Sequence, residues 1–260
     1  MTWTTLPRSE AGPLAAHAAG TGPRIVLLHG VGLRAEAWNG QIGALVRAGF
    51  KVIAPDMPGH GESPNLPDLR DLRSYADLAA ACLDEPAVVV GHSMGAMIAL
   101  DLVPRYPGRL RGVVALNAVY RRSAAAKEQV AARVSALGGV TNPDSSQTLE
   151  RWFGVTPSPE RAACARWLNA VDPAGYKSAY AVFAREDGPP DAALRSLHVP
   201  ALFMTGDAEP NSTPQMAHDM AALAPGGQAE IVAGAAHMMP MTHADAVSRS
   251  LVDFARECHS

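Results

Sequence analysis

Cysteine is scarce in this chain. Its 260 residues include only Cys82, Cys164 and Cys258, at wide spacings without a pattern. An odd number of cysteines arranged in this way argues against a disulfide-stabilised small domain and against a cysteine-rich metal site. We therefore expect reduced thiols and a cytoplasmic protein.

Charge is also limited, and long apolar runs are missing. Charged residues make up 18% of the chain, the formal net charge is −3, and no block of basic residues occurs. We therefore expect neither nucleic acid nor a membrane surface as a partner. No apolar stretch approaches the length of a membrane span. Residues 1–22 lack the basic start and apolar core of a signal peptide, so we expect none.

What the chain does have is 48% hydrophobic residues in alternating patterns. Short apolar runs predict strands near residues 25–29, 51–55, 88–90, 110–116, 199–204 and 229–232. Helical spacing predicts helices near residues 34–48, 70–84, 96–103, 214–223 and 244–256. Strands that alternate with helices favour an α/β fold with a mainly parallel, doubly wound sheet and helices on both faces.

This alternation is interrupted between residues 119 and 197. The segment carries helical fragments separated by prolines, and it contains half of the chain's fourteen aromatic residues. We interpret residues 119–197 as a helical lid inserted into a core formed by residues 1–118 and 198–260. The alternative is that these aromatic side chains only give a small subdomain its own core.

The most informative motif is Gly91-His92-Ser93-Met94-Gly95. It follows three β-branched residues, which favour a strand, and it precedes a helical pattern. A Gly-x-Ser-x-Gly sequence between a strand and a helix is typical of a sharp turn that holds a serine hydroxyl out for nucleophilic attack. Ser93 is therefore the candidate nucleophile.

A serine nucleophile needs a base, and the base needs an acid to orient it. His237 follows a predicted strand and a loop of small residues, so it is the preferred base over His243, which we expect at the start of the last helix. The acid comes from the loop after residue 206. We favour Glu209, while Asp207 stays an alternative that could instead cap the turn through the backbone.

Acyl transfer also needs donors for the oxyanion that forms on the carbonyl oxygen. The amide of Met94, directly after the nucleophile, is the first candidate. The loop His29-Gly30-Val31-Gly32 follows the first predicted parallel strand, and its small residues let the amide of Val31 approach a substrate. We expect His29 itself to be structural.

Two other functions have weaker signals. The run from Gly30 to Ala35, followed by Asp56, matches a dinucleotide fingerprint, but a dehydrogenase has no use for a serine elbow. His60 and Glu62 are two residues apart on a glycine-rich loop, and no metal-binding spacing is present. We expect no cofactor and no metal.

Aromatic and basic side chains are candidates for substrate binding. We expect Trp38 and Trp152 to contact substrate. Several arginines could bind a substrate carboxylate if they face the cleft, although arginines of a lid are more often solvated. These arginines are Arg34, Arg121, Arg122, Arg151 and Arg166.

Together, His29-Gly30, Asp-Met-Pro-Gly-His-Gly-Glu-Ser at residues 56–63, the serine motif, Gly206 with Glu209, and His237 resemble the α/β-hydrolase superfamily. The resemblance runs from about residue 20 to the end. It implies Ser93 as nucleophile, Glu209 as acid, His237 as base, and Val31 and Met94 as oxyanion-hole amides. Most relatives have aspartate three residues after the glycine, so the glutamate here leaves Asp207 in contention.

Within the superfamily, residues 150–153 and 172–180 resemble 3-oxoadipate enol-lactonase-like hydrolases, whereas the Gly-His-Ser-Met-Gly elbow is commoner among esterases and carbon–carbon bond hydrolases. We expect a cofactor-free serine hydrolase that cleaves a small ester or lactone through an acyl-enzyme. Alternatives are cleavage of an amide or a carbon–carbon bond next to a carbonyl, haloperoxidase-like perhydrolysis, and a small-molecule receptor with little turnover. The sequence leaves homo-oligomerisation open.

Overall fold

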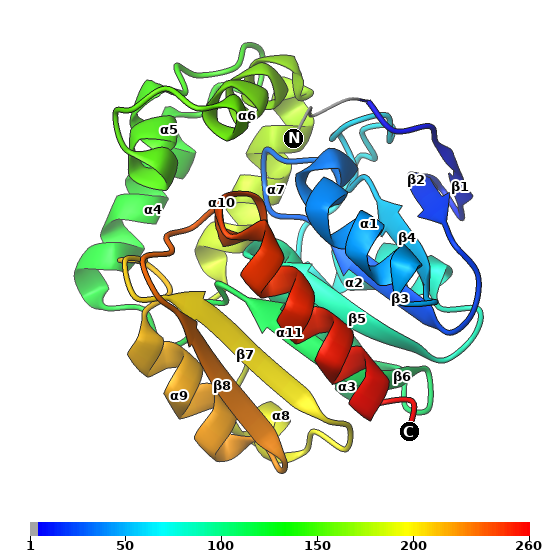
Figure 1. Cartoon of the computed structure of the whole chain (residues 1–260). Coiled ribbons are helices and arrows are strands. Elements are labelled where there is room, and N and C mark those ends of the chain that lie inside the picture. Colours follow the sequence, from blue (N-terminus) through cyan, green and yellow to red (C-terminus); the bar gives the residue numbers. More distant parts are fainter. Residues whose placement is uncertain (1–4) are drawn as a thin grey trace.

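A single mixed sheet organises the molecule (Figure 1). The computed structural model describes residues 5–260, which contain an eight-stranded sheet of order β1-β2-β4-β3-β5-β6-β7-β8. Its strands are β1 (Ser9–Ala11), β2 (Leu14–Ala19), β3 (Arg24–Leu28), β4 (Lys51–Pro55), β5 (Ala87–His92), β6 (Leu110–Leu116), β7 (Ala201–Gly206) and β8 (Gly227–Val232). The strands from β3 to β8 pair in parallel, which confirms the predicted doubly wound α/β sheet.

The two antiparallel strands at one edge were not expected from the sequence. β1 pairs with β2, and β2 pairs with β4, both antiparallel. The sequence of β2 is Leu-Ala-Ala-His-Ala-Ala, which lacks the β-branched and aromatic residues that signal a strand. Pairing with β4 therefore determines its conformation, rather than local propensity.

Helices cover both faces of the sheet because alternate residues of each buried strand face opposite sides. On one face, Val89 and Phe203 pack in a cluster with α2 (Leu72–Ala79), α3 (Met94–Arg105) and α9 (Pro214–Leu223). On the other face, Val90 and Met204 pack with α1 (Asn39–Arg47) and α11 (Ala244–Glu257), which lie side by side in Figure 1.

Two of the predicted helices are divided. The helix predicted at residues 34–48 consists of a 3-10 turn, η1 (Ala35–Trp38), and α1. The helix predicted at residues 70–84 consists of α2 and a second 3-10 turn, η2 (Ala80–Cys82). The short α10 (Met239–Thr242) precedes α11 and was not predicted.

Residues 119–197 form a helical insertion between β6 and β7, at the carboxyl ends of the parallel strands (Figure 1). Serine or aspartate caps begin three of its helices, and proline occupies the first turn of two. Its helices are α4 (Ala124–Ala136), α5 (Ser146–Phe153), α6 (Pro159–Ala170), α7 (Pro173–Arg185) and α8 (Asp191–Arg195).

The aromatic residues of the helical insertion build a third hydrophobic cluster. Trp152, Trp167 and Tyr176 pack there with Leu33 and Met238, which belong to loops of the sheet domain. The insertion therefore has a core of its own, and that core also fixes the insertion to the loops that surround the strand ends.

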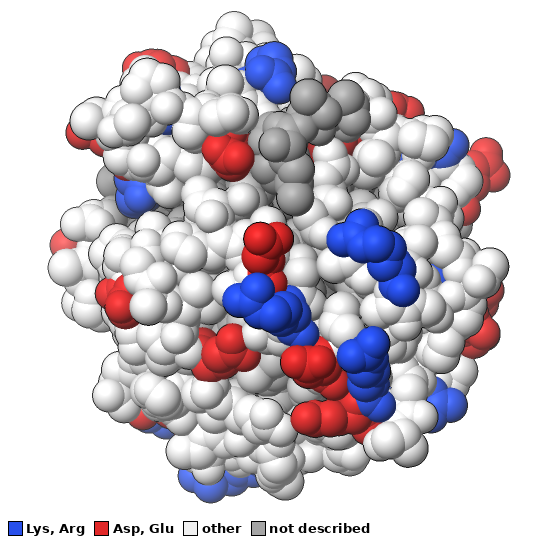
Figure 2. All heavy atoms as spheres, viewed as in Figure 1, with Lys and Arg blue, Asp and Glu red and all other residues white. Residues whose placement is uncertain are grey.

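Charges of both signs are mixed on the face shown in Figure 2. In the groove between α1 and α11, Arg47, Arg249 and Arg256 lie among Asp245 and Asp253. This face has no single-sign patch. Within residues 5–260, no helix has the length and apolar character needed to cross a membrane.

Candidate active site

Ser93 occupies a strained turn between β5 and α3. Its backbone angles are φ 56° and ψ −118°, in a region that non-glycine residues rarely adopt. The flanking glycines make the turn possible, since a Cβ on Gly91 would lie 2.0 Å from the oxygen of Gly95, and one on Gly95 would lie 2.1 Å from the oxygen of Leu28. The sharp turn predicted from the motif is therefore present.

Glu209 and His237 meet on neighbouring loops, after β7 and β8. His237 Nδ1 lies 2.8 Å from Glu209 Oε2. Because a carboxylate only accepts, Nδ1 carries a proton, so in the neutral form of the ring Nε2 is the acceptor. The amides of Asn211 and Ser212 donate to the other oxygen, Glu209 Oε1, over 2.7 and 3.4 Å.

The pKa of Glu209 reflects these contacts. Burial raises it, but the attraction of His237 and the hydrogen bonds from His237, Asn211 and Ser212 outweigh burial and lower it to about 2. The carboxylate is therefore ionised at neutral pH. A buried anion held in this way fixes the orientation of the imidazole.

The alternative residues on these loops have other contacts. Asp207 Oδ1 accepts a hydrogen bond from the amide of Gly234 at 2.7 Å, so this side chain caps a turn. His243 precedes α11, and its Nδ1 lies 3.0 Å from the hydroxyl of Thr242. The structure thus brings Glu209 to His237, and it brings neither Asp207 nor His243 into this pair.

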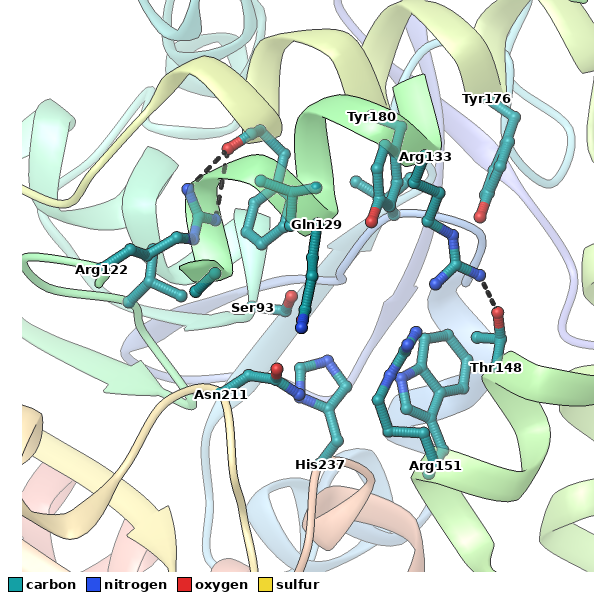
Figure 3. Close-up of a pocket in the computed structure, with 16 residues that line it drawn as sticks. Ser93, Arg122, Gln129, Arg133, Thr148, Arg151, Tyr176, Tyr180, Asn211 and His237 are labelled. Carbon is teal, nitrogen blue, oxygen red and sulfur yellow. Dashed lines mark hydrogen bonds between the residues drawn. The ribbon is translucent and has the colours of Figure 1, made fainter. Parts of the chain in front are cut away.

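Ser93 and His237 line the same cavity (Figure 3). Within residues 5–260 no hydrogen bond joins them, as is common for such a pair without substrate. Trp152 stacks on the imidazole of His237, with ring centroids 5.5 Å apart and planes at 23°. His92 Nε2 donates to the backbone oxygen of His237 at 2.8 Å, which helps to fix the loop that carries His237.

The predicted oxyanion loop is held by buried histidines. The amide of Gly32 donates to His60 Nε2 at 2.9 Å, while His60 Nδ1 donates to the oxygen of Pro58. His29 Nε2 accepts from the amide of Met57, which bears out the structural role expected for His29. These contacts occupy the amide of Gly32.

Val31 and Met94, whose amides the sequence suggested as oxyanion donors, lie beside Ser93. Val31 lines the cavity beside Ser93, and Met94 follows Ser93 as the first residue of α3. Within residues 5–260, neither amide donates to a backbone carbonyl in a turn or loop. The two amides are therefore available to a ligand.

The cavity extends from Ser93 and His237 under the helical insertion, with a volume of about 130 Å³. Side chains of α4, α5 and α7 form much of its wall. Of the arginines considered in the sequence, Arg122 and Arg151 line it. Arg133, which was not predicted as a candidate, lines it as well.

The helical periodicity of α4 is the sequence feature that could have identified Arg133 as a residue of the cavity. Ala126, Gln129, Val130 and Arg133 are spaced as i, i+3, i+4 and i+7, so they share one face of α4, and this is the face that lines the cavity. Asn211 was also missed, because its place depends on the path of the loop after β7.

The expectation that Trp38 contacts substrate is corrected by the structure. Trp38 is 1% exposed and packs in the cluster between the sheet, α1 and α11, with its ring edge against His92. Arg34 pairs with Glu36, Arg121 pairs with Asp191, and Arg166 contacts a carbonyl of its own helix. These arginines do not line the cavity.

The dinucleotide fingerprint has a structural explanation. Asp56, which a nucleotide ribose would need, is fully buried. It accepts hydrogen bonds from Arg8, from the amide of Ala35 and from the amide of Glu62. This carboxylate therefore holds the loops together and is closed to a ligand. Within the described residues, no group of three potential metal ligands was found.

A serine at a strained strand-to-helix turn, with an imidazole and a carboxylate from later loops of a parallel sheet, is typical of hydrolases that use a serine nucleophile. Residues 25–250 match the model of the alpha/beta hydrolase family. The chain belongs to this family.

Curated relatives and solved structures agree with this assignment. The chain is 36% identical over 239 residues to (E)-2-((N-methylformamido)methylene)succinate hydrolase of Acinetobacter baylyi, covering 89% of this chain and 90% of that protein. It is 27% identical over 240 residues to a pimeloyl-[acyl-carrier protein] methyl ester esterase of Neisseria meningitidis, covering 89% and 93%. A malate-bound thermophilic esterase from Thermogutta terrifontis superposes with a TM-score of 0.82 at 27% identity, covering 95% and 94%.

Proposed function

We propose that this protein is a serine hydrolase that cleaves a small carboxylic ester or lactone through an acyl-enzyme on Ser93. The observation that supports this most strongly is that His237, paired with Glu209, lines the same cavity as Ser93. A receptor that only binds a small molecule has no need of all three groups. Esterases among the similar proteins also favour ester hydrolysis.

The proposed reaction has two halves. His237 Nε2 takes the proton of the Ser93 hydroxyl as Oγ attacks the carbonyl carbon, and the resulting oxyanion is held by the amides of Val31 and Met94. The bond to the leaving oxygen then breaks, and that oxygen receives the proton from His237. His237 then deprotonates a water molecule, which attacks the carbonyl carbon of the acyl-enzyme. Ser93 Oγ recovers a proton from His237 as the carboxylic acid product leaves.

In this proposal the helical insertion, residues 119–197, acts as a lid over the core. It covers the carboxyl ends of the strands and supplies Trp152, which we expect to contact substrate as well as His237. Excluding water from the cavity would strengthen the hydrogen bonds to the oxyanion. The three cysteines form no disulfide, which supports extending the proposal to a cytoplasmic location.

Amide hydrolysis is the second candidate. The relative from Acinetobacter baylyi is named as a hydrolase of a formamido-substituted compound. The same serine, base and oxyanion donors serve an amide, provided that His237 protonates the leaving nitrogen before the bond breaks.

A panel of short acyl esters, lactones and N-acyl compounds, assayed with the wild type and with Ser93→Ala, tests both candidates. We expect Ser93→Ala to lower kcat for every substrate of the wild type by at least about 10³-fold, with an unchanged circular dichroism spectrum. The relative kcat/KM values then assign the bond type. Turnover by Ser93→Ala near the wild-type rate would contradict the proposed nucleophile.

A further inference from the structure

The charged side chains that line the cavity are all positive. Arg122, Arg133 and Arg151 line it, and no aspartate or glutamate is among its lining residues within the part of the chain that the structure describes. Arginines elsewhere commonly pair with carboxylates, as Arg8 does with Asp56 and Glu36. Within the described residues none of the three cavity arginines forms an ion pair with a carboxylate, and a carboxylate of a ligand would supply one.

We propose that Arg133 and Arg151 form a subsite for a carboxylate group of the substrate, so that the enzyme prefers small anionic esters, lactones or amides over neutral ones. This inference rests on the proposed function, because it concerns the substrate of the same site. It adds the charge of the substrate and the residues that recognise it.

Arg133 is held in place to receive an anion. It comes from α4 and is half-buried, it donates to the hydroxyl of Thr148 on α5, and its guanidinium lies over the ring of Tyr180, 5.4 Å from the centroid. Figure 3 shows its guanidinium directed into the cavity. Its side chain also hydrogen-bonds that of Tyr176, and the N–H donors not used by Thr148 and Tyr176 remain for a ligand.

Arg151 lies on α5, next to Trp152, on the same side of the cavity as Arg133 in Figure 3. Arg151 lines the cavity but is exposed to solvent, and within residues 5–260 its side chain makes no hydrogen bond and no ion pair. Burial lowers its pKa, and the nearby positive charge of Arg133 lowers it further. A carboxylate bound between the two guanidiniums would remove this repulsion and accept charge-assisted hydrogen bonds from both.

Arg122 is excluded from the subsite because its donors are already used. Its guanidinium donates to the backbone oxygens of Phe183 and Glu186 and lies 4.4 Å above the ring of Phe183. It therefore joins the segment after β6 to the end of α7. The unpaired cations are those of α4 and α5, and the carboxylate must lie on the part of the substrate that extends beneath these helices.

Two pairs of matched esters test the inference. Monomethyl succinate and methyl 4-oxopentanoate differ by a carboxylate on the acyl side, and acetoxyacetate and acetoxyacetone differ by one on the alcohol side. Each pair replaces a carboxylate by a methyl ketone of similar size. The quantity measured is the ratio of kcat/KM for the anionic ester to that for its neutral partner.

We expect this ratio to exceed one for at least one pair in the wild type, and to fall about 10–100-fold in Arg133→Gln and in Arg151→Gln. The neutral ester serves as an internal control for any disturbance of α4 or α5, since a distorted site loses both activities. Arg166→Gln, on the exposed side of α6, is the matched control and should keep the wild-type ratio.

Calorimetric titration of the Ser93→Ala variant with succinate separates binding from turnover. We expect binding that Arg133→Gln, introduced into the same background, weakens by at least about 10-fold. Ser93-dependent hydrolysis with a ratio unchanged in both arginine variants would overturn the inference and leave the proposed function intact. Succinate binding that depends on Arg133, without hydrolysis of the four esters or of any ester, lactone or N-acyl compound of the panel above, would support the subsite and contradict the proposed function.

Discussion

The positions of two acidic residues on the loop after β7 decide which of them reaches His237. Glu209 lies on a turn closed by the bond from its amide to the oxygen of Gly206, and its carboxylate spans the remaining distance to Nδ1. Asp207, two residues earlier, is directed to the amide of Gly234 on the neighbouring loop. The sequence named both acids, but the choice depends on the path of two loops, and no local pattern encodes that path.

Replacing each acid by its amide tests this assignment at the residue scale. We expect Glu209→Gln to lower kcat about 10²–10⁴-fold, because the imidazole loses the anion that orients it and stabilises its protonated form. Asp207→Asn should keep kcat within a few-fold of the wild type. Steady-state kinetics on an activated ester measures both. A larger loss of kcat in Asp207→Asn than in Glu209→Gln would contradict the assignment of Glu209 as the acid.

The misplaced and missed residues share one physical cause. Trp38 is close in sequence to the oxyanion loop, yet the 3-10 turn η1 directs it into the core. Arg133 is 40 residues after Ser93, yet the face of α4 carries it to the cavity. Proximity in the chain says little about which face of an element meets a cavity, because that depends on how elements pack.

At the scale of elements, the connection from β5 to α3 is the part of the fold that the sequence specifies most completely. Val88, Val89 and Val90 favour a strand, and both glycines of the motif are required by close backbone contacts. The parallel strands were also predictable, because each is a short apolar run buried on both faces. The hairpin of β1 and β2 was not, since small residues carry a weak signal.

The substitution Gly95→Ala tests how closely the backbone of α3 packs against the end of β3. A Cβ there would lie 2.1 Å from the oxygen of Leu28, so either β3 or α3 must move. We expect Gly95→Ala to lower the free energy of unfolding by at least about 2 kcal/mol. Gly138→Ala is the matched control, because a Cβ at Gly138 meets nothing within 4 Å. Equal urea midpoints for the two variants would contradict the observed packing.

At the scale of the whole molecule, buried neutral histidines join the loops around the site. Burial lowers the pKa of His60 to about 4, and burial followed by the charge of His237 lowers that of His92 to about 3. Both histidines are 1% exposed and act through hydrogen bonds to backbone groups of other loops. The folded state therefore resists their protonation.

This resistance makes stability depend on pH. Below the ordinary histidine pKa of 6.5 the unfolded chain takes up protons that the folded protein refuses, so stability is full above that pH and falls as the pH drops toward 4. We expect the resistance of each of these two histidines to protonation to lower the free energy of unfolding by about 2 kcal/mol between pH 7.5 and pH 5. Urea unfolding at these two pH values measures the loss.

His60→Gln tests whether His60 contributes to this loss of stability. The side-chain amide of glutamine can still accept a hydrogen bond from the amide of Gly32, but it does not titrate. We expect the loss of stability of this variant between pH 7.5 and 5 to be smaller than that of the wild type by about 2 kcal/mol. His218→Gln, on the exposed side of α9, is the control. An equal loss in His60→Gln and the wild type would show that another group controls the acid response.

The most direct measurement is the mass of the intact protein, followed by peptide mapping, after brief reaction with p-nitrophenyl acetate and acid quenching. The account predicts a single acetyl group on the peptide that carries Ser93 in the wild type, more of it in Glu209→Gln if deacylation is slowed further than acylation, and none on that peptide in Ser93→Ala. Hydrolysis of the ester with the acetyl group on another residue, and with the peptide of Ser93 unmodified, would contradict it.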